Sequence, residues 1–137
     1  MNSLVSTIHS SLNRTVVDKH FFDRFYDVFI SSHPDIAPLF ANTDMESQKA
    51  MLHHGLMQSL AYLDGKSTGR LTMERIRHSH GPDAMNIPHE PYDYWQRSLL
   101  QVVEETDPRY SPEIAKAWKE FSQTVVELIS GKKDLDT

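Results

Sequence analysis

The sequence contains no cysteine. This absence excludes disulfide bonds, zinc or iron–sulfur sites with thiolate ligands, and any cofactor attached covalently through a C-x-x-C-H motif. The chain also lacks a stretch of about 18 or more apolar residues, and its first residues lack the apolar run of a secretory signal. We therefore expect a cytoplasmic protein with no membrane partner.

Clusters of basic residues are missing as well. There are 14 lysine and arginine residues against 19 acidic ones, which gives a formal net charge of −5, and the basic residues form no run. A protein that binds nucleic acid irrespective of its sequence needs a clustered basic face. We expect no nucleic-acid partner.

The remaining composition is that of a soluble globular protein, with 39% hydrophobic and 24% charged residues among 137. This length is enough for one hydrophobic core and too short for two independent ones. We therefore expect a single domain spanning residues 1–137.

Helical periodicity dominates the first third of the chain. Apolar residues recur at four-residue steps at Leu4, Ile8 and Leu12, which predicts a first amphipathic helix. The strongest pattern follows as a broad apolar face made by Val17, Phe21, Phe22, Phe25, Val28 and Phe29. This second helix should end before Pro34, and a corner with a short new turn should occupy residues 31–40.

The middle of the chain predicts a long helix followed by a shorter one. Thr43 and Glu46 have the spacing of a capping box, and leucines follow at near-helical intervals at positions 52, 56, 60 and 63. A polar loop is expected between Gly65 and Gly69. Residues 71–80 then read as a shorter helix closed by Gly81-Pro82.

Two more helices complete the pattern. Pro88 and Pro91 bracket the start of the first, which should end at Asp107-Pro108. Ser111-Pro112 provides a cap and a first turn for the last helix, which Gly131 should stop. The expected inner residues are Tyr92, Trp95, Leu99, Leu100, Val102 and Val103, then Ile114, Trp118, Phe121, Val125, Leu128 and Ile129. With no convincing alternating run, the sequence predicts an all-α fold of six or seven helices.

Specific residues point to a family. The segment FYDVFISSHPDIAPLF at residues 25–40 resembles the junction of the second and third helices in bacterial haemoglobins and flavohaemoglobins. Gln48, Leu52 and His80 follow in step, as does the pattern I-P-x-x-x-Y-x-x-W-x-x-x-L-L over residues 87–100. The resemblance covers nearly the whole chain. It implies a globin fold of six to eight helices around a haem pocket.

The resemblance also assigns roles. It makes His80 the proximal iron ligand, Tyr26 and Gln48 the distal polar pair, Phe40 the ring that packs on the haem, and Leu52 part of the distal wall. It places Tyr92 and Trp95 beside the cofactor. The cofactor would be a non-covalent haem b, because no cysteine is present to attach it. Phe121 and Ser122 stand where flavohaemoglobins place a tyrosine on the last helix.

The chemistry of gas binding fits these residue types. Ferrous haem needs a neutral imidazole on one face and an open position on the other to bind dioxygen or another diatomic gas. A tyrosine hydroxyl and a glutamine amide directed at bound dioxygen would stabilise it by roughly 1–3 kcal/mol in a pocket of low dielectric constant.

Each assignment has a structural alternative. His80 could be an exposed histidine at a helix end, and only one of His78 and His80 can face the haem, because residues two apart point in different directions. Tyr26 could be a core residue and Gln48 an exposed one. His53 or Lys49 could reach the sixth coordination position if its helix were shifted or rotated.

The functional hypothesis is a globin that binds dioxygen or another diatomic gas reversibly. One alternative is a nitric oxide dioxygenase, which would need a separate reductase as its partner. Another is a globin-fold signalling domain, with or without haem. An exposed pair of final helices could also form a homodimer.

Overall fold

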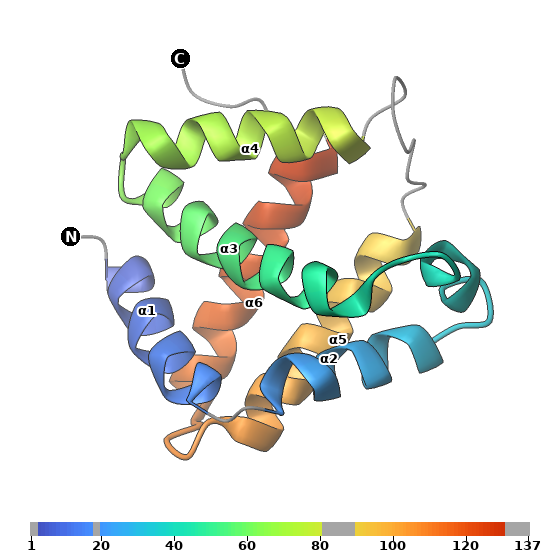
Figure 1. The fold of residues 1–137 in the computed structure, drawn as a ribbon. Helices are drawn as coiled ribbons and strands as arrows, with labels where there is room; N and C mark the ends of the chain where they lie inside the picture. The colour runs from blue at the N-terminus through green and yellow to red at the C-terminus, as the bar shows by residue number, and fades with distance from the viewer. Residues whose placement is uncertain (1–2, 18–19, 81–89, 131–137) are drawn as a thin grey trace.

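The computed structural model describes residues 3–17, 20–80 and 90–130, and all regular elements in this part of the chain are helices (Figure 1). The predicted all-α class is confirmed. The elements are α1 Ser3–Val16, α2 Phe21–Ser31, the short 3-10 helix η1 Ala37–Phe40, α3 Met45–Leu63, α4 Ser67–His80, α5 Glu90–Thr106 and α6 Pro112–Ser130. Among the described residues, no helix is long and apolar enough to cross a membrane.

Pairs of helices pack on one another around a central helix. The helices α3 and α4 form one pair, α2 and α5 cross as another, and α6 runs between them in contact with α1, α4 and α5 (Figure 1). Most apolar positions expected to face inward do so. The largest fully buried side chains include Trp118, Phe21, Phe25, Phe121, Ile8 and Leu12.

The expected apolar face of α2 begins four residues too early. Val17 was expected on this face, but it is 78% exposed. The reason is that α1 continues to Val16 and α2 begins only at Phe21, so that Val17 belongs to neither helix. Apolar residues continue at helical spacing from α1 into α2, so periodicity alone does not reveal the turn between the two helices.

The start of α3 also differs from the prediction, because Asp44 and not Thr43 is the N-cap. Asp44 has an extended backbone, and its Oδ1 accepts hydrogen bonds from the amides of Glu46 and Ser47 at 3.1 and 3.4 Å. Aspartate is among the most favourable N-cap residues, since it satisfies amides that have no partner within the helix. The capping box with Thr43 is therefore wrong by one position.

The connection between α3 and α4 is shorter than expected. Gly65 adopts φ +82°, a conformation that suits glycine, but Gly69 lies inside α4, which begins at Ser67. A Cβ at Gly69 would lie 2.7 Å from the carbonyl oxygen of Gln58 and closer still to the amide of Tyr62. The predicted loop between the two glycines is wrong, because Gly69 serves the close packing of α4 against α3.

Other helix ends agree with the sequence. The helix α2 ends at Ser31, before Pro34, and α5 ends at Thr106, before Asp107-Pro108. Ser111 Oγ accepts a hydrogen bond from the amide of Ile114 at 3.2 Å, which caps α6. The stops expected at Gly81-Pro82 and Gly131 and the start expected at Pro88 lie outside the described residues.

Candidate functional site

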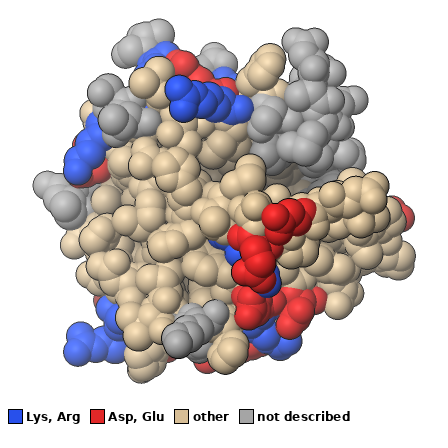
Figure 2. Space-filling model, viewed as in Figure 1, with Lys and Arg blue, Asp and Glu red and all other residues tan. Residues whose placement is uncertain are grey.

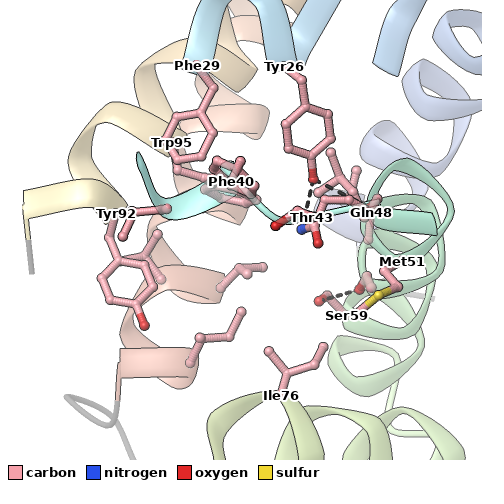
Figure 3. Close-up of a pocket in the computed structure, with 17 residues that line it drawn as sticks. Tyr26, Phe29, Phe40, Thr43, Gln48, Met51, Ser59, Ile76, Tyr92 and Trp95 are labelled. Carbon is pink, nitrogen blue, oxygen red and sulfur yellow. Dashed lines mark hydrogen bonds between the residues drawn. The ribbon is translucent and has the colours of Figure 1, made fainter. Parts of the chain in front are cut away.

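A cavity of about 350 Å³ lies between the helices. The sites of small molecules and cofactors in proteins typically measure roughly 300–1,000 Å³ and have mainly apolar walls. Figure 3 shows the side chains that surround the space. They are Tyr26, Phe29, Leu39, Phe40, Thr43, Gln48, Met51, Leu52, Gly55, Leu56, Ser59, Ile76, Tyr92, Trp95, Val125, Val126 and Ile129.

One long wall of the cavity is a stripe along α3. Gln48, Leu52, Leu56 and Ser59 recur at steps of three or four residues, so they share one face of the helix. From Gln48 to Ser59 the helix rises by eleven steps of 1.5 Å, so this wall is about 16 Å long. Gly55 adds no side chain to it, and a Cβ there would meet Ile76 Cδ1 at 3.7 Å, an ordinary contact. One side of the cavity is therefore formed by a long face of a single helix.

Tyr26 and Gln48 form a polar pair on this largely apolar surface. Gln48 Nε2 donates to the Tyr26 hydroxyl at 3.2 Å, and the hydroxyl lies 3.5 Å from the carbonyl oxygen of Gln48. Tyr26 is 4% exposed, and its burial raises the pKa of its phenol, an effect that the hydrogen bond from Gln48 and the charge of Lys49 only partly offset. The hydroxyl thus stays protonated at neutral pH and can act as a donor.

The hydroxyl proton of Tyr26 is poorly used by the protein. Hydroxyl hydrogen bonds to oxygen are normally about 2.5–3.0 Å long, so the 3.5 Å contact with the Gln48 carbonyl is weak. Among the described residues, Tyr26 has no stronger acceptor. Figure 3 shows Tyr26, Thr43 and Gln48 together at one side of the cavity. This side can therefore offer a donor to a small polar ligand.

Aromatic rings form the end of the cavity next to η1. Phe40 makes edge contacts with Tyr26 and Phe29, with ring centroids 5.8 Å apart in both pairs. Trp95 packs edge-on against Phe25 at 6.2 Å. Tyr92 is 8% exposed, and its burial raises the pKa of its phenol. The rings hold one another in place and give the site a rigid apolar border.

The helix α4, which packs against α3, closes the cavity on the side away from Tyr26 (Figure 3). Ile76 lines the space, and His80 lies four residues further on, at a register position on the same face of α4. His78, two residues before His80, is exposed. The side chain of His80 lies outside the described structure, so its role as a ligand remains a prediction from register.

Lys49 and His53, the two alternative distal residues, are engaged elsewhere. Lys49 Nζ forms ion pairs with Asp23 at 2.7 Å and Glu46 at 3.4 Å, and the pairing raises the pKa of the lysine and lowers that of Asp23. His53 is exposed, and its ring contacts Phe22 at 5.2 Å. Figure 2 shows acidic side chains gathered over α2 and the start of α3, while most of the surrounding face is uncharged.

The last helix contributes three apolar residues to the cavity and no tyrosine. Phe121 is fully buried against Trp118, and Ser122 Oγ accepts a hydrogen bond from Gln96 Nε2 at 3.0 Å. Ser122 therefore belongs to the contact between α5 and α6, and Phe121 belongs to the hydrophobic core. The difference from flavohaemoglobins noted in the sequence does not change the cavity wall, which Val125, Val126 and Ile129 provide.

All six site residues expected from the sequence whose side chains are described line the cavity, namely Tyr26, Phe40, Gln48, Leu52, Tyr92 and Trp95. The sequence reasoning did not identify Thr43, Met51, Gly55, Ser59 and Ile76 as lining residues. Steps of three and four residues from Gln48 reach Met51, Gly55 and Ser59, so helical register could have found these three. Thr43 and Ile76 depend on how separate elements pack, which no local pattern reveals.

A family model for globins matches residues 23–129. The chain belongs to the globin family. A solved structure with a TM-score of 0.87 and 32% sequence identity covers 93% of this chain and 96% of its own. It is the protein PA3967 from Pseudomonas aeruginosa PAO1, described as structurally highly homologous to a human haemoglobin. A comparison with curated proteins finds no match. The globin fold expected from the sequence is confirmed.

Globins as a family bind haem and diatomic gases, and the residues of this globin fit a haem group. The cavity has largely apolar walls and one polar pair with spare donor capacity. Apolar side chains that line an empty space lose van der Waals contacts, which costs free energy. A bound haem would supply those contacts. Tyr26 and Gln48 border one side of the cavity, and Ile76 of α4 borders the other.

Proposed function

We propose that this globin binds haem b non-covalently, with His80 as the iron ligand, and that it binds dioxygen or another diatomic gas reversibly. The observation that carries the proposal is the Tyr26–Gln48 pair, whose phenol proton is only weakly engaged inside an otherwise apolar cavity. A buried donor without a good acceptor costs free energy unless a ligand uses it.

The proximal assignment rests on helix register. Ile76 lines the cavity, and His80 is one turn further along the same face of α4, whereas the exposed His78 is not. When bound, haem would supply an iron with one coordination position for His80 and one for a gas. A hydrogen bond to the other ring nitrogen of His80 would fix the orientation of the imidazole.

The distal side would act through donors and through exclusion of water. The Tyr26 hydroxyl and the Gln48 amide can donate to the partially negative end of dioxygen, while Leu52 and Phe40 keep the surroundings apolar. Carbon monoxide, whose oxygen would carry much less negative charge when bound, would gain much less from these donors. The site therefore favours dioxygen, and we expect dioxygen to leave slowly.

The test is the visible spectrum of the protein loaded with haemin, reduced and then exposed to carbon monoxide. We expect stoichiometric haem, a five-coordinate reduced spectrum and a sharp shift with carbon monoxide. His80→Ala should lose or alter this spectrum. His78→Ala, a change in an exposed histidine of the same helix, serves as the matched control and should behave like the wild type.

Four outcomes would contradict the proposal. Failure to bind haem stoichiometrically would make this a globin fold without haem. An unchanged spectrum in His80→Ala, or equal losses in both variants, would remove the ligand assignment. A six-coordinate reduced spectrum before gas is added would mean that a side chain occupies the position assigned to the gas.

A further inference from the structure

Arg77 makes a hydrogen bond that leaves its own helix. Its Nε donates to the carbonyl oxygen of Leu128 at 2.7 Å. Arg77 is partly buried and Leu128 is 2% exposed, so the bond joins α4 to α6 inside the molecule. Its environment is unlike that of Arg75, which is exposed two residues earlier on α4.

The acceptor is a carbonyl at the end of a helix. The helix α6 ends at Ser130, so Leu128 lies in its last turn, where a carbonyl has no amide partner four residues further on within the helix. A cation at this end also meets the negative end of the helix dipole, and hydrogen bonds from charged donors are stronger than neutral ones. Arg77 therefore stabilises the end of α6 and its attachment to α4 together.

The bond reaches the same turn of α6 that forms the cavity wall. Val126 and Ile129, close to Leu128 in sequence, line the cavity, and so does Ile76, the neighbour of Arg77. At its other end, α4 packs so closely on α3 that only glycine fits at position 69. The helix is thus held at two points, by α3 near its start and by α6 near its end.

We propose that Arg77 is a positioning residue that holds the last turn of α4 against the cavity wall and thereby sets the geometry with which His80 meets the haem iron. The inference rests on the proposed function, because it requires His80 to be the ligand. Arg77 and His80 are three residues apart, a rise of about 4.5 Å along the helix. A shift of the Arg77 turn would therefore be transmitted to His80.

The experiment compares three variants of the full-length, haem-loaded protein. Arg77→Met removes the donor and keeps a flexible apolar side chain. Arg77→Lys keeps a charged donor with different geometry. Arg75→Met removes an exposed cation from the same helix and is the matched control. Hydrogen exchange of the amides in the last two turns of α4 measures how firmly the Arg77–Leu128 bond holds this end of the helix. The iron–histidine band in the resonance Raman spectrum of the reduced protein measures the geometry at His80.

In Arg77→Met we expect exchange in these turns to be about 10-fold faster or more, since a charged hydrogen bond is lost. The iron–histidine band should shift or broaden while haem remains bound. Arg77→Lys should change both readouts less and in the same direction. If Arg77→Met does not fold, the changes in Arg77→Lys test the proposal instead. Arg75→Met should match the wild type.

The proposal is overturned if Arg77→Met exchanges faster but keeps the wild-type band, because the bond is then only structural. It is also overturned if exchange does not change, or if Arg75→Met has an equal effect. Absence of a His80-dependent band in the wild type would instead refute the proposed function, and this inference with it. The two failures are therefore distinguishable.

Discussion

Two buried polar sites in this globin use their hydrogen-bonding capacity to different degrees. Where α1, α5 and α6 meet, the Asp107 carboxylate accepts hydrogen bonds from Ser11 at 2.6 Å, from Arg14 at 2.7 and 2.9 Å, and from the amide of Arg109 at 2.9 Å. In the cavity, the contacts between Tyr26 and Gln48 are 3.2 and 3.5 Å long. The first site is saturated and holds helices together, whereas the second keeps capacity for a ligand.

The saturated site extends further into the core. Trp118 Nε1 donates to Ser11 Oγ at 2.8 Å, so the serine hydroxyl accepts from the tryptophan while it donates to Asp107. Burial alone would raise the pKa of Asp107, but the hydrogen bonds from Arg14, Ser11 and the Arg109 amide outweigh it and lower the pKa to about 2. The carboxylate is therefore ionised at all ordinary pH values.

The largest effect is expected from Asp107→Ala, which would remove the centre of the saturated site. Breaking one side of a buried ion pair costs about 3–5 kcal/mol, and the 23% exposure of the Arg14 side chain favours the lower end. We expect the free energy of unfolding, measured by urea denaturation, to fall by about 3 kcal/mol. The spectrum of the folded, haem-loaded variant should not change.

The control for Asp107→Ala is Glu105→Ala, which breaks an ion pair with Arg24 in which both side chains are more than one-third exposed. We expect no measurable loss of stability, because solvent screens such pairs. A similar loss in both variants would show that burial and saturation do not distinguish the Asp107 site.

A second, smaller effect follows from the pKa of Asp107. Its folded value of about 2 lies below the ordinary 3.8, so the site contributes stability above pH 4 that is lost as the pH falls from about 4 to 2. At 1.36 kcal/mol per pKa unit, the loss amounts to about 2 kcal/mol. Urea denaturation across this range should show this fall in the wild type and a smaller one in Asp107→Asn. Equal slopes in the two proteins would contradict the assignment.

The sequence allowed one of these two sites to be predicted but not the other. Tyr26 and Gln48 were found because they lie at fixed positions in a family pattern, and the cavity brings both together. Asp107 was noted only as the end of a helix, and Trp118 only as a core residue. Their cluster depends on Ser11, about a hundred residues away in sequence, and no local pattern encodes this contact.

The fold shows the same division between local and long-range information. Helix existence followed from periodicity, and the prolines at positions 34, 108 and 112 marked helix boundaries correctly. The errors at Val17 and Thr43 are local shifts of four residues and one residue, where a turn or a better cap competes with the pattern. The error at Gly69 is different in kind, because the reason for that glycine is the backbone of a neighbouring helix.

At the Tyr26–Gln48 pair, the open site of the comparison, we expect the opposite result: Tyr26→Phe should change gas binding and leave stability almost unchanged. Only weak contacts are lost, so the free energy of unfolding should change by less than about 1 kcal/mol. A lost donor to dioxygen worth about 1–2 kcal/mol should speed dioxygen dissociation from the haem-loaded protein about 5- to 30-fold. Stopped-flow displacement by carbon monoxide measures the rate. A large loss of stability with an unchanged rate would show that Tyr26 is only a core residue.

The smallest effect is expected at Lys49 and His53, the residues next to the open site that the structure turns away from it. Lys49 is held by Asp23 and Glu46, and the ring of His53 lies against Phe22, so neither lines the cavity. Lys49→Met and His53→Ala should therefore leave the five-coordinate reduced spectrum of the haem-loaded protein unchanged. If the wild type is instead six-coordinate and one of these variants restores five-coordination, then α3 shifts when haem binds, and the gas must compete with an internal ligand for its coordination position.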